Sequence, residues 1–396
     1  MRPLRRKPLA LVVAVIAVAA GATVALTTST TPPVSTTLPV AQFNRIVLSY
    51  TSTLSTTAEA NRYQFMIMQA TDASEIKVLK AANPNLKVLL YQDPFLARPT
   101  DPTGLTVCST WPTLSHGWMI KDRAGGIVQD VEEPGNYLMN LSNTDYQHSC
   151  VIHAITLAKQ LGADGILFDD INAALGWYLP AAVTVPKFPT SASWENGETS
   201  FLEYAAEQVH AAGLLVFANL GGASTVPGLW EQWSGILDGS QEQSWNDWAA
   251  GTADSLAEWQ QLLQEPIWSE AHKKYTLLES DDNGERQNTF GLASMMLVAD
   301  GKTSYSTANL NQTADEQWYP TYSAAQQLGD PAGKYAELPD GIYLRLFTNG
   351  LVIVNPTDTA RSFTLSRALV NSATGRRVTS LSVAAESGYI LVRPTS

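Results

Sequence analysis

Residues 162–174, GADGILFDDINAA, begin with a helix-ending glycine, continue through a short apolar run and reach two adjacent acids, Asp169 and Asp170. An apolar run of this length that does not alternate with polar residues is typical of a parallel strand buried on both faces. A carboxylate is costly to bury unless something there uses or satisfies it. The stretch therefore predicts a parallel strand that ends in a site where carboxylates have a function.

Seven further runs of the same kind follow one another along the chain, separated mostly by helical patterns. They are residues 43–50, 63–70, 86–93, 214–220, 235–241, 275–280 and 302–307. Eight strand–helix units in about 285 residues predict an α/β fold, a (β/α)8 TIM barrel over residues 41–334. A doubly wound open sheet is the alternative, although the Gly-rich first turn that usually marks it is missing from the sequence.

Two of the predicted helices have recognisable ends. Residues 144–161 place apolar side chains at helical spacing, with Asn143 positioned to cap their start and Gly162 to end them. A second helix, residues 198–212, ends at Gly213. The first of these helices leads directly into the strand that carries the two acids.

The pattern changes near residue 335. Residues 341–357, GIYLRLFTNGLVIVNPT, form two β-rich runs joined by Asn349 and Gly350, a pair typical of hairpin turns. More strand-like runs and no amphipathic helix follow. Residues 335–396 therefore predict a small C-terminal antiparallel β-domain.

The start of the chain has the pattern of an export signal. Cations precede an apolar run, residues 8–26, and Ala20 and Ala22 offer an A-x-A-like cleavage site. Because about 20 apolar residues also cross a bilayer, an uncleaved membrane anchor is the alternative for residues 1–26. Residues 27–40 are rich in Thr and Pro and predict an extended linker. We therefore expect a secreted or cell-surface protein that meets a membrane only through its N-terminal segment.

The overall charge restricts the partners of the chain. Its formal net charge is −12 at pH 7, and several of its cations lie in the export signal. Such an acidic body argues against nucleic acid as a partner. The charge fits a neutral or cationic substrate that is met outside the cell.

The cysteines and the missing motifs narrow the chemistry. Cys108 and Cys150 are the only cysteines, and a disulfide is the default for an exported chain, with two unpaired buried thiols as the alternative. The histidines are scattered without the spacing of a zinc site. Motifs for acyl transfer, NTP hydrolysis and dinucleotide binding are also missing. We therefore expect neither a metal nor a cofactor.

Carboxylates gather where the predicted strands end. In (β/α)8 enzymes the catalytic side chains lie at the C-terminal ends of the strands and in the loops that follow. Polar residues at the ends of the fourth to seventh strands are Asp169, Asp170, Asn219, Asp238, Glu242, Glu279, Asp281 and Asp282. Glycoside hydrolysis needs one carboxyl group to protonate the leaving oxygen and a second as nucleophile or base. The acids at these strand ends predict a glycosidase whose catalytic candidates are Asp169, Glu242 and Asp170.

The three acids have different expected roles. Because neighbours in a strand point to opposite sides, we expect Asp169 to face the barrel mouth as nucleophile or charge stabiliser. Asp170 should turn aside to cap the next helix or bond a loop backbone. Glu242 is the expected partner acid, its pKa raised by the apolar surfaces of Trp245 and Trp248. The alternatives are an ordinary helix cap for Asp170 and a solvated loop charge for Glu242.

Aromatic residues concentrate in the same loops and offer flat faces for sugar rings: Trp118, Trp177, Tyr178, Trp194, Trp245 and Trp248. The expected substrate contacts are Trp118, Trp177, Trp245, Asn219, Glu279 and Tyr91. Single tryptophans are more often core residues, so only some of these should touch a ligand. Residues 280–285, SDDNGE, faintly suggest a calcium loop, but the spacing does not match an EF-hand and favours a solvated acidic loop.

Five stretches between residues 43 and 394 occur in a familiar order: ANPNLKVLLYQ (81–91), HGWMIKDRAGG (116–126), LGADGILFDD (161–170), WYPTYSAAQQLGDPAG (318–333) and RLFTNGLVIVNPT (345–357). Together they make the chain resemble the predicted glycosyl-hydrolase-like family 15, a distant relative of α-galactosidase and polygalactosaminidase barrels. The resemblance implies a (β/α)8 barrel, a C-terminal β-sandwich and glycosidase activity. It places the nucleophile at Asp169 and a later acid at Glu242. Asn140 stands where related barrels often carry Asp, so that side of the pocket should differ.

Three functions follow from these patterns. The leading one is an exported glycosidase that cleaves an extracellular or cell-envelope polysaccharide or oligosaccharide. The alternative from another class is a non-catalytic glycan-binding barrel on the cell surface, which would have no need for both Asp169 and Glu242. A third is a metal-dependent hydrolase of another bond, with Asp169 and Asp170 as ligands.

Overall fold

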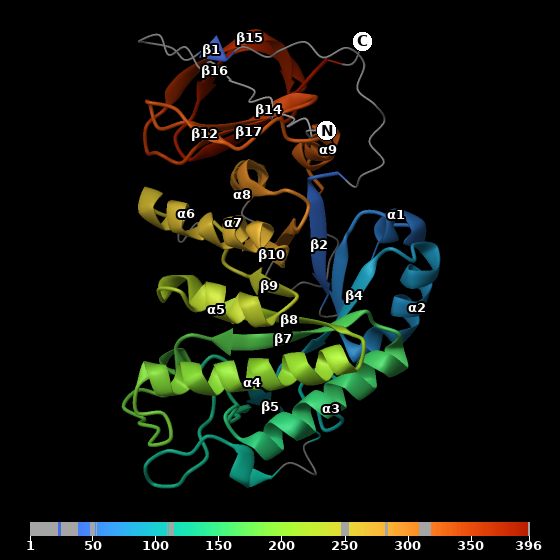
Figure 1. Cartoon of the computed structure of the whole chain (residues 1–396), viewed down its shortest axis with the longest axis vertical. Helices are drawn as coiled ribbons and strands as arrows, with labels where there is room; N and C mark the ends of the chain where they lie inside the picture. Colours follow the sequence, from blue (N-terminus) through green and yellow to red (C-terminus); the bar gives the residue numbers. More distant parts are fainter. Residues whose placement is uncertain are drawn as a thin grey trace, which may run out of the picture.

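The computed structural model describes residues 23–24, 39–47, 52, 54–108, 110, 115–246, 253–281, 284–308 and 318–394. Eight parallel strands in this part of the chain close into a barrel (Figure 1). They are β2 (Gln42–Val47), β3 (Phe65–Met68), β4 (Lys87–Gln92), β7 (Gly165–Asn172), β8 (Leu215–Gly221), β9 (Gly239–Glu242), β10 (Tyr275–Asp281) and β11 (Thr303–Ala308). Because β11 pairs with β2, the sheet has no open edge, and the predicted (β/α)8 barrel is confirmed over the open sheet.

Helices cover the outside of the barrel. They are α1 (Thr56–Ala60), α2 (Ala73–Ala82), α3 (Thr144–Leu161), α4 (Ser191–Ala211), α5 (Leu229–Ile236), α6 (Leu256–Leu262), α7 (Gln264–Ala271), α8 (Glu285–Val298) and α9 (Pro320–Gln327). The ends of α3 are those predicted: the Asn143 side chain accepts the Tyr146 N–H at 3.0 Å, and Gly162 adopts a left-handed conformation. No helix within the described ranges has the length and apolarity needed to cross a bilayer.

The interior of the barrel changes from apolar to polar along the strands. Leu89, Leu167, Phe217 and Leu277 pack with other apolar side chains inside it. Side chains of a strand alternate between its two faces, so the residues two positions further along also face inward. These residues are Tyr91, Asp169, Asn219 and Glu279, at the C-terminal ends of β4, β7, β8 and β10. The alternation therefore gathers a polar layer in the barrel mouth.

Strand β9 begins later than predicted, because α5 takes up the first residues of the predicted run 235–241. Asp238 consequently precedes the strand, where it accepts the Val216 N–H at 2.9 Å and lies 2.9 Å from the His210 Nε2 atom. The prediction that Asp238 follows the strand is wrong. It lies at the opposite end of the barrel from the polar layer.

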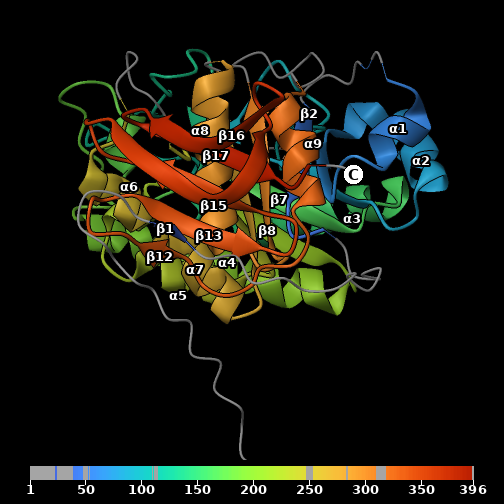
Figure 2. The ribbon, with the colours of Figure 1, turned by 90° about the horizontal axis from the view of Figure 1, so that it is seen from above.

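A second sheet follows the barrel, at the red end of the chain in Figure 2. Its strands are β12 (Ala336–Glu337), β13 (Tyr343–Phe347), β14 (Gly350–Asn355), β15 (Arg361–Asn371), β16 (Arg376–Val383) and β17 (Ser387–Val392), with β1 (Thr23–Val24) added beside β15. Strands β12 to β17 pair in antiparallel fashion, as predicted. Phe363 of β15 and Ile353 of β14 belong to one apolar core, although β17 lies between their strands.

The predicted hairpin forms with its turn one residue earlier than expected. Phe347 pairs with Gly350, which leaves Thr348 and Asn349 as the turn residues. Gly350 is needed for a different reason: a Cβ there would lie 2.0 Å from the Leu391 carbonyl oxygen. Glycine at this position permits β14 and β17 to approach one another.

Helix α8 connects the barrel to this sheet. It packs on β10 and β11 on one side and on β13, β14 and β17 on the other. At Gly388 of β17, a Cβ would lie 2.6 Å from the Ala293 Cβ atom and 2.7 Å from the Thr289 carbonyl oxygen. The sheet therefore sits directly on the backbone of α8. Of the predicted export signal and linker, residues 1–40, only 23–24 and 39–40 lie within the described residues.

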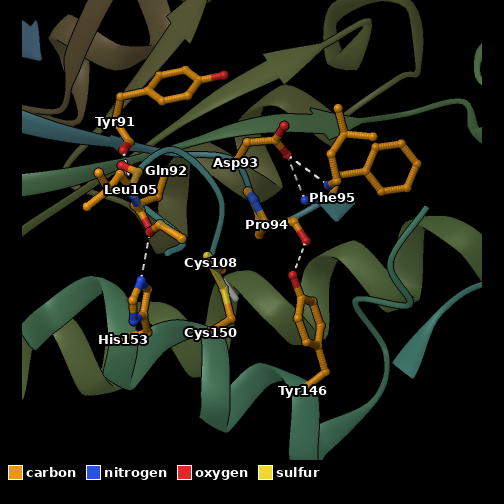
Figure 3. Close-up of a disulfide and its surroundings, with 12 residues drawn as sticks. Tyr91, Gln92, Asp93, Pro94, Phe95, Leu105, Cys108, Tyr146, Cys150 and His153 are labelled. Carbon is orange, nitrogen blue, oxygen red and sulfur yellow. Dashed lines mark hydrogen bonds between the residues drawn. A yellow bond between two sulfur atoms is a disulfide. The ribbon is translucent and has the colours of Figure 1, made fainter. Parts of the chain in front are cut away.

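The predicted disulfide joins Cys108 to Cys150 across 42 residues of sequence, with a Cα–Cα distance of 4.5 Å. Figure 3 shows that it fastens the loop after β4 to α3. The Tyr146 hydroxyl donates to the Pro94 carbonyl, and the His153 Nε2 atom lies 2.8 Å from the Gly104 carbonyl oxygen. Closing a loop of this length stabilises a folded chain by about 3–4 kcal/mol in the chain-entropy model.

Candidate active site

A cavity of about 440 Å³ opens beside the C-terminal ends of β7, β8 and β9. The loop after β7 and helix α6 contribute to its walls. Its lining includes Asp170, Trp177, Tyr178, Asn219, Glu242 and Gln243. Carboxyl groups, amides and aromatic rings thus meet in one concave site at the rim where the sequence predicts the chemistry.

Asp169 lies at the barrel mouth, where two donors bind its carboxylate. The Tyr91 hydroxyl donates to Oδ2 at 2.7 Å, and Asn219 Nδ2 donates to Oδ1 at 2.8 Å. Burial and then the charge of Asp169 raise the pKa of Tyr91 well above its ordinary value, so that the phenol keeps its proton. Each oxygen of the Asp169 carboxylate is therefore bound by one donor, and together the two donors fix the orientation of the carboxylate.

Asn219 connects Asp169 to the cavity. Its Nδ2 atom also donates to Gln243 Oε1 at 2.7 Å, and both amides line the cavity. Asp169 is partly exposed and lies one hydrogen bond behind this lining. The strand-end amide predicted to bind substrate therefore also orients the predicted nucleophile.

Asp170 turns into the cavity instead of away from it. The pairing of β7 with β8 shifts register between Phe168 and Ile171, and Asp170 adopts a φ of 55° in the left-handed region. Its carboxyl group lies 3.2 Å from the Tyr178 hydroxyl and 3.4 Å from Asn172 Nδ2. The predicted helix cap is wrong, because the short helix η4 (Leu175–Trp177) has no side-chain cap. A bulge, which the residue pattern does not reveal, redirects this side chain.

A buried glutamate stands behind Asp170. Glu198 of α4 is 0% exposed, and neither carboxyl oxygen has a hydrogen-bond partner among the described residues. Burial and then the charge of Asp169 raise the pKa of Asp170 well above its usual range. Burial and then the charge of Asp170 do the same for the pKa of Glu198. Burial therefore favours the neutral form of both acids.

Glu198 was not among the predicted site residues, although its position carries a signal. The buried face of α4 includes Trp194, Glu198, Phe201, Leu202 and Ala205. Glu198 is the acid in this apolar stripe, at the spacing of one helical turn from Trp194. An ionisable side chain in a helix stripe that faces the core is a candidate for a functional site.

Glu242 is the last residue of β9 and lines the cavity, with 6% of its surface exposed. Its Oε1 atom accepts the Ser244 N–H at 2.9 Å. Its expected neighbour Trp245 is fully buried and donates its ring N–H to the Gly291 carbonyl at 3.0 Å. Trp248 lies outside the described residues. Among the described side chains, Glu265 of α7 interacts with Glu242.

Trp177 and Tyr178 are the predicted aromatic residues that line the cavity, and Trp177 is the exposed one. Its side chain is 51% exposed, which is unusual for an indole and leaves one face available to a ligand. The ring lies over Gly222, where a Cβ would be 2.5 Å from a ring carbon and φ is 67°. Glycine is therefore required beneath the ring, because a Cβ would clash with the indole and because the backbone has a positive φ.

The other predicted substrate contacts lie elsewhere. Trp245 belongs to the core, and half-buried Trp118 packs on Tyr146 with ring centroids 5.8 Å apart, so neither lines the cavity. Tyr91 and Glu279 lie buried in the barrel mouth, where Glu279 Oε2 accepts from Gln241 Nε2 at 3.2 Å. None of these four side chains lines the cavity, because packing in the core and in the mouth encloses them, and their contact with substrate stays a prediction.

Asp93, at the end of β4, is a further buried acid that sequence reasoning missed. Its oxygens accept the N–H groups of Phe95 and Leu96 and a 3.0 Å bond from Arg98. Burial raises the pKa of Asp93 to about 7, although the Arg98 charge lowers it. Its charge also contributes to the raised pKa of Asp170.

Asp169 and Asp170 are the metal ligands expected in the metal-dependent alternative. Within the described ranges, no three His, Cys, Asp or Glu side chains converge as metal ligands. Asp169 is bound by Tyr91 and Asn219, whereas Asp170 faces Tyr178 across the cavity wall. The two neighbouring carboxyl groups thus have separate partners. Asp282 lies outside the described residues.

Comparison with known proteins gives a family match. The model of the hypothetical glycosyl hydrolase family 15 matches residues 80–351. A search of curated proteins finds no match.

Solved structures of similar architecture include glycosidases. A noncanonic maltogenic α-amylase, AmyB from Thermotoga neapolitana, has a TM-score of 0.49 at 10% identity over 90% of this chain and 99% of its own. The GH27 β-L-arabinopyranosidase Abp of Geobacillus stearothermophilus has a TM-score of 0.49 at 8% identity, over 90% and 96%. The isomalto-dextranase of Arthrobacter globiformis has a TM-score of 0.46 at 12% identity, over 90% and 73%.

Proposed function

The chain belongs to the hypothetical glycosyl hydrolase family 15, and we propose that it is an exported glycosidase that cleaves an extracellular or cell-envelope polysaccharide. The observation that carries this proposal is the cavity at the barrel rim. Glu242 and the exposed indole of Trp177 both line it, and the lining amide of Asn219 donates to Asp169. Acids from two different strands at one sugar-sized site suit a two-carboxylate reaction.

In this mechanism Glu242 is the acid and Asp169 is the nucleophile or charge stabiliser. Glu242 gives its proton to the glycosidic oxygen as the bond from that oxygen to the anomeric carbon breaks. Asp169, held by Tyr91 and Asn219, bears the negative charge that attacks or stabilises the anomeric centre. Water then supplies the hydroxyl group of the new reducing end, and its proton returns to Glu242.

The remaining cavity residues bind the sugar. The exposed face of Trp177 supports a pyranose ring, because the C–H face of the sugar is apolar. Asp170 is a neutral acid and donates to a sugar hydroxyl, whereas Asn219 and Gln243 present amides to others. No cation lines this cavity in the described part of the chain, which suits a neutral glycan better than an acidic one.

The purified protein should release new reducing ends from at least one member of a panel of neutral and amino-sugar polysaccharides. Boiled protein is the control for chemical hydrolysis. Saturable glycan binding with no new reducing ends would instead support the alternative, a non-catalytic glycan-binding barrel. Loss of activity on chelation would point to the metal-dependent hydrolase.

Export is supported by the Cys108–Cys150 disulfide, since disulfides persist in oxidising compartments. We expect the native protein in the extracytoplasmic or membrane-attached fraction, without titratable thiols after unfolding in the absence of reductant. Reduction before unfolding should expose both thiols, which serves as the control. A cytosolic protein with two free thiols would contradict export.

A further inference from the structure

The proposed acid, Glu242, lies against a second buried carboxyl group, that of Glu265. Glu242 at the end of β9 is 6% exposed, and Glu265 in the first turn of α7 is 2% exposed. Glu265 lines a second cavity of about 350 Å³, which shares Ser224 and Gln261 with the cavity that Glu242 lines. The two carboxyl groups therefore line neighbouring cavities that share part of a wall.

No well-formed hydrogen bond reaches either oxygen of Glu265 in the described part of the chain. The polar side chains that act on it at close range are the Glu242 carboxyl and the Ser224 hydroxyl. Among more distant charges, that of Glu231 on α5 acts on it, and this charge is also negative. Glu265 thus faces acids without a neutralising partner among the described residues.

The neighbouring elements, as far as the structure describes them, supply no cation to Glu265. Charged side chains on or beside α6, α7, α8 and β10 include Asp254, Glu258, His272, Lys274, Glu279 and Arg286. Lys274 donates to the carbonyls of Gly235 and Leu237, and Arg286 donates to the Ala385 carbonyl at 2.9 Å. His272 Nδ1 lies 2.8 Å from the Trp268 carbonyl oxygen.

We propose that Glu265 shares one proton with Glu242 and thereby keeps Glu242 able to act as an acid at neutral pH. This inference rests on the proposed function, in which Glu242 protonates the leaving oxygen. Two carboxylates in contact, both out of water, cannot both ionise near pH 7. Glu265 touches no substrate in this scheme and acts through Glu242 as a positioning residue.

Burial and then the Glu242 charge raise the pKa of Glu265 well above its usual range. Each carboxyl group also has one donor that favours its charged form, the Ser224 hydroxyl at Glu265 and the Ser244 N–H at Glu242, so the shared proton can lie on either. When Glu265 carries the charge, Glu242 holds the proton and presents it to the cavity. After transfer to the leaving oxygen, the proton taken from water restores this state, so that no other proton source is needed.

The test is the pH dependence of kcat for Glu265→Gln on the glycan that the panel identifies. Glutamine keeps the size, removes the second acid and donates an N–H to Glu242, so Glu242 ionises at lower pH. The alkaline limb should therefore move toward acid by about one pH unit or more, a loss of about tenfold in kcat at fixed pH on that limb. Activity should recover as the pH is lowered.

Two variants separate this role from a structural one. Glu231→Gln removes a nearby charge without altering the carboxyl contact and should leave the profile nearly unchanged. Glu265→Asp retains a carboxyl group and should restore part of the alkaline limb. Equal losses in Glu265→Asp and Glu265→Gln at all pH values would overturn the proposal.

A measurement without substrate distinguishes this inference from the proposed function. Infrared difference spectra at pH 7 should show the band of a protonated carboxylic acid in the wild type that Glu265→Gln lacks and Glu231→Gln keeps. This result would support the shared proton even if no glycan were cleaved. Identical carboxylic-acid bands in the wild type and Glu265→Gln, with the variant folded, would refute it.

Discussion

Replacement of Asp169 by Asn should abolish turnover while glycan binding survives. Asparagine has nearly the same shape but cannot attack or stabilise the anomeric centre with a full negative charge. Loss of one transition-state hydrogen bond lowers kcat by about 10²–10³-fold, and loss of this charge should exceed that. The measurement is kcat for the release of reducing ends, with glycan affinity determined separately by calorimetry.

Asp170→Asn is the matched control for this variant. Burial raises the pKa of Asp170 and favours its neutral form, which an amide imitates more closely than it imitates a carboxylate. We expect a modest effect, chiefly on KM. The assignment would fail if Asp170→Asn were inactive with an intact fold while Asp169→Asn retained near-normal kcat. Thermal unfolding checks the fold of Asp169→Asn, since its new amide can accept from only one of the two present donors, Tyr91 and Asn219.

Replacement of Glu242 by Gln should lower kcat on natural glycans by about 10²–10⁴-fold, the usual contribution of general acid–base catalysis. The loss should depend on the leaving group. The phenolate of an aryl glycoside with an acidic phenol leaves without protonation. The rate of the bond-breaking step should therefore fall far less on this substrate.

The comparison of the two substrates is an internal control for damage to the site. Misplacement of Asp169 or Trp177 would reduce the rate on both substrates alike. An equal loss for the aryl glycoside and the natural glycan would therefore argue against Glu242 as the proton donor. Near-normal activity of Glu242→Gln on the natural glycan would exclude that role outright.

Each acid that lines the cavity at a strand end is accompanied by a buried glutamate from a helix. Glu198 of α4 interacts with Asp170, and Glu265 of α7 interacts with Glu242. Both glutamates lie in buried faces of their helices, where an ionised carboxylate would be costly. Protonation of Glu198 avoids this cost, and in the proposed pair one proton shared by Glu265 and Glu242 reduces it.

Local patterns predicted much of the fold. Unbroken apolar runs marked the strands, because a strand covered on both faces has no exposed side to carry polar residues. Asn143 and Gly162 marked the ends of α3 through the conformations they stabilise. The position of β9 was predicted too early, because the end of α5 is as apolar as a buried strand. Periodicity does not separate the two in so short a segment.

The sequence by itself determined which strands carry the site and that Asp169, Asn219 and Glu242 stand at their ends, since the apolar run of a buried strand and the alternation of its side chains are local patterns. Only the tertiary structure decided the rest. The bulge that turns Asp170 into the cavity, the burial of Trp245 and the meeting of Glu242 with Glu265 all depend on contacts between distant segments. Desolvation and charge proximity set the protonation of an acid, and both arise only when the chain is packed.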